Sequence, residues 1–298
     1  MPLTLQHAVQ LGCFSASIVL SCANVVAQET SSEPAASSST SPSTSAVKDD
    51  RRLWELGISG ASLSQQAYPG SDVNVNKILV IPLFLYRGEH FRVDRSETGF
   101  RAVKSPTFEF DIGFSGSFGA KSDKIEARKG MEVLGNLIEF GPRLKWNLSP
   151  AEQNGKWRLE FPLRGVFDVS HQFKNRGLTF EPELKFERTA AAGWRYVNSL
   201  SVVLGNQQMA DSFYTVLPSQ ATSQRPAYQA QKGLIMWRAS TFISYAINQD
   251  LRAFGGVRID TVSGAANEAS SLIKKKTAAS FFLGMTYTWQ RSDRRAYE

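Results

Sequence analysis

Cysteine is nearly absent from this sequence. Its two cysteines, Cys13 and Cys22, lie within the first thirty residues of a 298-residue chain, and none follows them. A mature chain that has lost this segment has no disulfide, no thiol chemistry and no cysteine-bound metal. Histidine is also scarce, since only His90 and His171 follow the same segment. No HExxH metal motif, Walker loop or dinucleotide fingerprint occurs, so neither a cofactor nor a metal is expected.

Long apolar runs and clustered charge are missing as well. No segment approaches the roughly eighteen consecutive apolar residues of a spanning helix, which excludes a helical membrane protein. The formal net charge is +7. Lysine and arginine are spread along the chain without an arginine-rich tract, so nucleic acid is not an expected partner. Diffuse positive charge suits anionic lipid headgroups or glycan polymers, although a soluble protein surface shows the same count.

The first fifty residues divide into two segments of different composition. Residues 1–27 have the form of a secretory signal, with an apolar stretch and a small-residue cleavage pattern that ends at Ala27. A lipoprotein signal with Cys22 as the acylated residue is the alternative. Leu20 is unusual in such a signal, so cleavage after Ala27 is favoured. Residues 28–50 are mostly Ser, Thr, Pro and Ala and predict a disordered periplasmic leader.

One stretch determines the interpretation of the remaining chain. From Thr107 to Phe118, apolar and polar residues alternate, with Gly116 completing the apolar row. This is the period-two pattern of a strand with one apolar and one polar face. Strands of soluble sheets are about five or six residues long, whereas a transmembrane strand needs about 9–11. The stretch is therefore typical of a strand in a membrane-embedded barrel.

The same alternation recurs along the chain. Regular runs occupy 138–148, 157–169, 178–187, 194–204, 234–247, 251–262 and 278–290. Less regular runs occupy 53–62, 77–86, 91–103 and 207–216. The total of about twelve is an even number, as bacterial barrels require. The expected fold is all-β, a closed antiparallel transmembrane β-barrel of about 12 strands (range roughly 10–14).

Prolines and connections give further expectations. Pro142, Pro162 and Pro182 lie inside three of the runs and predict bulges or strand ends, because proline lacks a ladder donor. Connections alternate between short and long, as expected of tight periplasmic turns and longer outer loops. The connection 119–136 is long but falls on the periplasmic side, so either a strand is miscounted or this loop faces inward. The run 78–86 is apolar on both faces, which leaves its register open.

Aromatic side chains often stand at the ends of these runs. They are Trp54, Tyr86, Trp146, Trp157, Trp194, Tyr287 and Trp289. Such rings match the aromatic girdles of a membrane barrel, the alternative being the core of a soluble sandwich. The last run has the Gly-x-x-aromatic-x-aromatic form common in the closing strand of outer-membrane barrels. A barrel domain over 51–290 is expected, followed by a polar tail over 291–298.

Several segments resemble the MipA/OmpV family of outer-membrane proteins. The segment 67–72 is similar to the family's Tyr-x-Gly-Ser loop, and Pro82 with Arg87-Gly88 resembles its second strand and following turn. The segment 211–233 is similar to the aromatic-x-Val-x-Pro-x-Gln-Ala loop that leads to Pro-x-Tyr and a glycine, with Arg225 at a usual leucine position. The segment 130–136 resembles the stretch before the family's next strand. Together the likeness covers roughly residues 53–290.

The resemblance implies an outer-membrane location in a Gram-negative envelope. Some members of the family are described as scaffolds that hold a lytic transglycosylase near a class A penicillin-binding protein. A murein hydrolase and synthase are therefore implied partners, beside outer-membrane lipid and lipopolysaccharide. The expected function is a non-enzymatic scaffold or interaction protein of envelope (murein) maintenance. The alternatives are a narrow porin for small solutes and an outer-membrane lipid-modifying enzyme that uses His171 in a Ser–His–acid triad from separate strands.

Two sets of residues are candidates for a functional role. The loop residues, which either cover the mouth, present a binding surface or pack on themselves for stability, are Tyr68, Gly70, Ser71, Phe213, Tyr214, Pro218, Gln220, Pro226 and Tyr228. The charges expected on inward strand faces are Glu109, Asp111, Arg143, Lys145, Arg158, Glu160, Arg164, Glu181 and Glu183. A sign-selective pore carries a ring of one charge. The mixture of signs instead favours cross-strand ion pairs in a narrow or filled lumen.

Overall fold

The computed structural model describes residues 52–88, 91–93, 98–120, 124–149, 155–190 and 193–295. These residues form one antiparallel sheet of 13 strands. The strands are β1 (Trp54–Gln66), β2 (Asn74–Arg87), β3 (Phe91–Val93), β4 (Thr98–Lys104), β5 (Phe108–Ser117), β6 (Leu137–Asn147), β7 (Lys156–Asp168), β8 (Lys174–Phe180), β9 (Glu183–Thr189), β10 (Trp194–Gly205), β11 (Gly233–Ala246), β12 (Leu251–Thr261) and β13 (Thr277–Arg291). The helical segments are α2 (Gln207–Tyr214), η4 (Glu126–Arg128), η5 (Val169–His171) and η7 (Pro218–Gln220).

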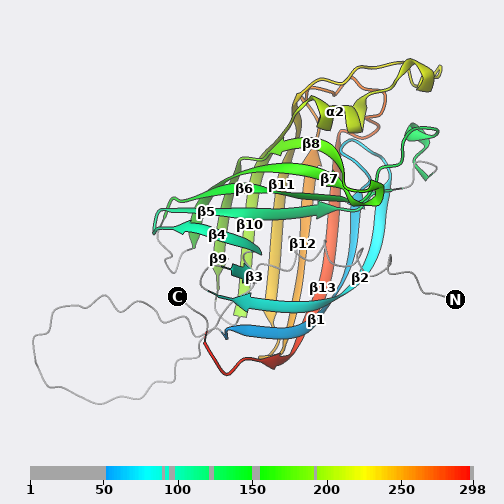
Figure 1. The fold of residues 1–298 in the computed structure, drawn as a ribbon. Helices are drawn as coiled ribbons and strands as arrows, with labels where there is room; N and C mark the ends of the chain where they lie inside the picture. The colour runs from blue at the N-terminus through cyan, green and yellow to red at the C-terminus, as the bar shows by residue number, and fades with distance from the viewer. Residues whose placement is uncertain are drawn as a thin grey trace, which may run out of the picture.

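The sheet closes on itself. Each strand pairs with its neighbours along the chain, and β13 pairs with β1 from Glu55–Arg291 to Ser64–Phe281. β8 and β9 both lie between β7 and β10, and the β10–β11 ladder completes the ring. Figure 1 shows the strands curving around a common interior. The expected closed antiparallel barrel is confirmed, because pairing on both sides of every strand leaves a closed wall.

β8 and β9 are two pieces of one strand. Both pair with β7, and Glu181 with Pro182 separates them. Counted as one, they give a wall of about twelve strands, as bacterial barrels allow. The ladder between β6 and β7 likewise has no pair at Gly141 or Pro142, while its register is unchanged on either side. A proline without an N–H donor interrupts the ladder in both places.

Two of the predicted strand assignments are wrong, and the two errors together leave the total number of strands unchanged. The run 207–216 is the helix α2, and the run 91–103 is the hairpin of β3 and β4. The additional strand moves the connection 119–136 to the same end as the other long loops. We call this end the long-loop end, and the opposite one, where β1 begins and β13 ends, the short-turn end. Figure 1 shows α2 and the end of β13 at opposite ends of the barrel.

The wall has an apolar outer face. Leu283 and Leu200 point outward with 70% and 63% of their surfaces exposed, and phenylalanines 108, 110 and 114 do the same on β5. Such exposure is unfavourable in water and favourable in hydrocarbon, so this face lies against lipid. The open register of β2 is settled, because Leu83 and Leu85 are buried inward and Phe84 is exposed outward. Among the described residues, no helix is long and apolar enough to cross a membrane.

Aromatic rings form a girdle at the short-turn end. Five of the six tryptophans stand at strand ends there, and only Trp237 lies near the other end. Paired rings such as Phe108–Trp146 and Trp194–Tyr245 lie with centroids 5.7 and 4.6 Å apart. Rings of this kind mark the level of the lipid headgroups.

The polar tail continues the β1–β13 ladder beyond this girdle. Leu53 donates its backbone N–H to Arg294 (2.8 Å), Ser292 donates to Trp54 (2.9 Å), and Arg52 forms an antiparallel bridge with Arg295. The tail therefore extends the sheet out of the membrane together with the chain that precedes β1. The expected signal over 1–27 and leader over 28–50 lie outside the described residues.

Candidate functional site

Loops at the long-loop end pack into a cap over the mouth of the barrel. We use "cap" for the described parts of 67–73, 118–136, 206–232 and 262–276. Their buried apolar side chains join those at the strand ends in the larger of two hydrophobic clusters, whose members include Tyr68, Ile125, Met131, Met209, Ala210, Phe213, Tyr214, Val216, Ala230, Ile235, Met236, Val262 and Leu272. The cap is thus a packed core of its own, formed by segments far apart in the sequence.

Two tyrosines connect the cap loops. The Tyr68 hydroxyl donates to the Leu272 carbonyl (2.5 Å), and the Tyr214 hydroxyl donates to the Pro69 carbonyl (3.1 Å). Burial raises the pKa of Tyr68 to about 12 and raises that of Tyr214 as well, so both stay neutral donors. Gly70 has a φ of 91° and accepts two backbone hydrogen bonds from Lys274 and Lys275. A Cβ there would lie 2.8 Å from Ile273, so only glycine fits this position.

Two arginines hold the described part of the 118–136 loop against α2 and the segment that follows it. Arg128 is 3% exposed, donates to the carbonyls of Phe213 (2.7 Å) and Ser212 (3.4 Å), and lies 5.4 Å from the ring centroid of Tyr68. These carbonyls are at the C-terminal end of α2, where a cation is favoured. Desolvation lowers the pKa of Arg128 from its usual value. Arg225 donates to the carbonyls of Ala127 (3.1 Å) and Lys129 (3.0 Å).

The expected loop residues divide between the core of the cap and its tip. Tyr68, Ser71, Phe213 and Tyr214 are buried, and Gly70 is buried with them. Pro218 and Pro226 are exposed in the projecting hairpin closed by the Val216–Tyr228 bridge. Gln220 in η7 and Tyr228 in the closing bridge are half-buried. The buried part of the loop therefore belongs to the cap over the mouth, and the exposed tip over 217–229 projects from it.

The lumen contains a continuous chain of ion pairs, which we call the lumen ion-pair chain. Its members are Glu109, Asp111, Arg143, Lys145, Arg158, Glu160, Glu183 and Lys185, which lie on β5, β6, β7 and β9. Glu160 is at its centre, 2.7 Å from Arg158, 3.3 Å from Lys185 and 3.4 Å from Arg143. Lys145 and Arg143 lie 2.9 and 2.6 Å from Asp111. Acids and bases are equal in number, so the lumen ion-pair chain itself carries no net charge.

A second charged cluster lies below the cap. Arg238 donates to Asp260 (2.8 Å) and Glu181 (2.9 Å), and Arg164 donates to Glu181 (2.8 Å). This cluster borders a cavity of about 100 Å³, and cap residues that include Tyr68 form its roof. Glu181 and Arg164 were expected in the lumen from sequence, whereas Arg238 and Asp260 were not singled out, although both fall on the inward face of their strands.

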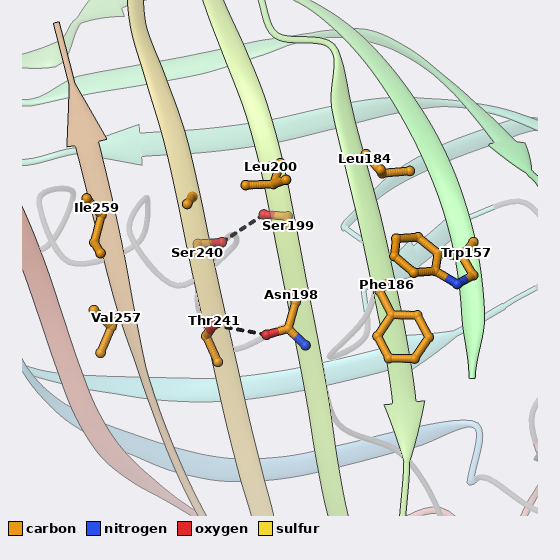
Figure 2. Close-up of a pocket in the computed structure, with 11 residues that line it drawn as sticks. Trp157, Leu184, Phe186, Asn198, Ser199, Leu200, Ser240, Thr241, Val257 and Ile259 are labelled. Atoms are coloured by element: carbon orange, nitrogen blue, oxygen red, sulfur yellow. Dashed lines mark hydrogen bonds between the residues drawn. The ribbon is translucent and has the colours of Figure 1, made fainter. Parts of the chain in front are cut away.

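The outer wall over β7 and β9 to β12 is shallowly hollowed (Figure 2). Leu184, Leu200 and Trp157 border it on one side and Val257 with Ile259 on the other, around a volume of about 310 Å³. Two polar side chains in its floor satisfy each other, because the Thr241 hydroxyl donates to Asn198 Oδ1 (2.9 Å). This surface belongs to the lipid-facing wall.

Catalytic geometry is not assembled around the one described histidine. His171 Nδ1 lies 2.8 Å from Asp168 Oδ2, in a cluster where Asp168 also accepts from Arg176 (2.7 Å). The Ser170 hydroxyl accepts from the backbone N–H of Asn136 (2.9 Å). Ser170 and His171 lie in η5 rather than on a strand. Among the described residues, no group of three or more His, Cys, Asp or Glu side chains is arranged to hold a metal.

The apolar outer wall, the aromatic girdle and the neutralised lumen define the class of protein. It is an outer-membrane β-barrel. The chain belongs to the MipA family, because the model of the family described as "MltA-interacting protein MipA" matches residues 56–289. The resemblance expected from the loop segments is therefore confirmed. No curated protein matches the chain.

Several solved membrane barrels are distantly similar. The NanC porin has a TM-score of 0.37 at 8% identity, covering 78% of this chain and 100% of that one. OprB of Pseudomonas putida has 0.35 at 7% identity, covering 80% and 94%. The outer membrane protease OmpT of Escherichia coli has 0.29 at 9% identity, covering 83% and 99%. Because all three scores are below 0.5, the fold assignment depends on the strand pairing described above.

Proposed function

We propose that this protein is a non-enzymatic interaction or scaffold protein of the outer membrane, linked to murein maintenance and exported by a cleaved N-terminal signal. The observation that supports it best is the interior. The ion-pair chain around Glu160, which is 1% exposed, lines the lumen wall over β5, β6, β7 and β9, and the packed cap covers the mouth. A barrel so filled offers its two ends to partners. The family description, MltA-interacting protein, agrees with such a role.

A partner on the murein side meets the short-turn end. Tight turns and chain termini of outer-membrane barrels face the periplasm, and the longer loops face outward. The described turns 105–107 and 247–250 and the paired tail are all at the short-turn end. Exposed arginines 52, 294 and 295 make this rim basic. An acidic surface on the partner complements it, since opposite potentials accelerate association and select the partner.

Affinity capture from gently solubilised envelopes tests this role. Tagged wild-type protein is expected to retain a murein hydrolase or synthase, identified by mass spectrometry. The double variant Arg52→Glu with Arg294→Glu is expected to lose it. Lys129→Glu with Lys232→Glu, an equal double charge reversal at exposed positions of the opposite end, is the matched control and is expected to retain the partner. Capture of no murein enzyme by the wild type would remove the scaffold role.

The narrow porin is the second candidate, and planar bilayers separate the two. A filled and capped barrel is expected to pass no steady current. Deleting the exposed tip 217–229 leaves the lumen ion-pair chain intact and is expected to leave the bilayer silent. Steady single-channel steps from the wild type would instead favour transport.

A further inference from the structure

The cavity below the cap lies between three walls of the lumen. Glu139 on β6, Thr179 on β8 and Arg258 on β12 all border it. Its volume of about 100 Å³ is room for several waters, or for a solute of roughly five to eight non-hydrogen atoms. Polar groups that line a cavity of this size need partners, because unpaired polar atoms in a buried site are costly.

Most charges at the cavity are already matched. Glu181 accepts from Arg164 (2.8 Å), Arg238 (2.9 Å) and the Ser201 hydroxyl (3.0 Å). Asp260 accepts from Arg238 at 2.8 Å. These groups have little capacity left for a further ligand.

Three polar side chains that line the cavity can form further hydrogen bonds. Within the described part of the chain, the Glu139 carboxylate accepts no hydrogen bond, and its nearest cation, Arg164, is 3.7 Å away. Arg258 contacts Asp260 through Nε at 3.0 Å, so its two terminal amino groups remain available among the same residues. The Thr179 hydroxyl is in a residue 4% exposed and has no partner there.

We propose that this cavity binds a small zwitterion of the α-amino acid type. Arg258 presents two parallel N–H donors, the geometry that a carboxylate accepts in a bidentate manner. Glu139 presents an anion to the ammonium group, and the Thr179 hydroxyl supplies a neutral hydrogen bond. The ligand has no net charge, so it uses the remaining hydrogen-bonding capacity of these groups without disturbing the charge balance of the surrounding cluster. This site is independent of the scaffold role at the short-turn end.

Calorimetric titration of the purified barrel in detergent tests the proposal. Glycine is the probe, with acetate and methylammonium as the two halves of a zwitterion. Glycine is expected to bind saturably at millimolar concentrations, and each half at least tenfold more weakly. Arg258→Gln and Glu139→Gln are each expected to weaken glycine binding at least tenfold, and Thr179→Val by a few fold.

Matched controls come from an ion pair elsewhere in the lumen. Arg195 donates to Glu187 (2.6 Å) near the short-turn end, so Arg195→Gln and Glu187→Gln remove the same charges away from the cavity. Both are expected to bind glycine as the wild type does. Heat-modifiable migration on a gel shows that each variant is folded. If Arg258→Gln does not fold, Arg258→Lys keeps the positive charge but lacks the two parallel N–H donors of the guanidinium. This variant is expected to bind glycine more weakly than the wild type does.

Three results would overturn the zwitterion site. They are the absence of saturable heat with glycine, acetate binding as tight as that of glycine, and folded Arg258 and Glu139 variants that keep wild-type affinity. The second result would indicate an anion site at Arg258 alone.

Discussion

Replacing Glu160 distinguishes a filled lumen from a water-filled one. Glu160 is 1% exposed and lies within 3.4 Å of Arg143, Arg158 and Lys185. In Glu160→Gln, three cations lose their shared anion while the shape of the side chain is kept. If the lumen is dry and packed, breaking such a buried pair costs about 3–5 kcal/mol. If water fills it, exposed ion pairs of this kind contribute only about 0–1 kcal/mol.

Chemical denaturation in detergent gives the free energy of unfolding, followed by tryptophan fluorescence and by heat-modifiable migration. We expect Glu160→Gln to lose about 3 kcal/mol, roughly a hundredfold in the unfolding equilibrium. Glu126→Gln is the control, since that side chain is 87% exposed. Combining Glu160→Gln with Lys185→Met removes one charge of each sign and is expected to recover part of the loss. A loss below about 1 kcal/mol for Glu160→Gln would refute the filled lumen.

Three further predictions concern the cap and are checked by hydrogen exchange of its amides. Hydrogen bonds from Arg176, together with Lys174, lower the pKa of Glu132 to about 2 from an ordinary 4.5. Its stabilising effect is therefore complete above pH 4.5 and lost as the pH falls toward 2. The effect is below about 1 kcal/mol because the side chain is half exposed. The described amides of 124–134, corrected for the intrinsic exchange rate at each pH, should therefore lose protection in acid in the wild type but not in Glu132→Gln. Asn206→Ala removes the oxygen that accepts from Met209 (3.0 Å) at the start of α2 and should destabilise that helix by about 1 kcal/mol. Tyr68→Phe removes the hydrogen bond to Leu272 and should destabilise the cap by roughly 0.5–1.5 kcal/mol. Unchanged protection in any of the three would contradict that contact.

The strands of the barrel wall could be predicted from sequence because the alternation that defines them is visible in consecutive residues. A strand between hydrocarbon and a polar lumen must alternate at every residue, and the run from Thr107 to Phe118 does so. The run 207–216 forms a helix and not the expected strand because its buried residues, Met209, Ala210, Phe213 and Tyr214, repeat at helical rather than strand spacing. The hairpin at 91–104 was read as one strand because β3 is only 3 residues long.

The cap and the cavity below it could not be predicted in this way. Arg128 and Tyr68 meet because loops from different strand pairs converge, and no periodic pattern records which loops pack together. In the sequence Arg225 is only a departure from the family pattern, whereas in the structure it donates to the carbonyls of Ala127 and Lys129. Glu139 and Arg258 lie on the inward faces of their strands, as alternation predicts. Their remaining hydrogen-bonding capacity depends on which cross-strand neighbours are already paired.

The alternating exposure of β5 to lipid and lumen is the central claim, and site-directed spin labelling tests it directly. The only cysteines, Cys13 and Cys22, precede the barrel, so single cysteines can be placed one at a time over 108–117 in reconstituted protein. We predict that labels at even positions from 108 to 114 collide with oxygen dissolved in lipid, while those at 109 and 111 are shielded from it. Equal accessibility at odd and even positions, or collision of the even labels with a water-soluble reagent instead, would contradict the barrel in the membrane.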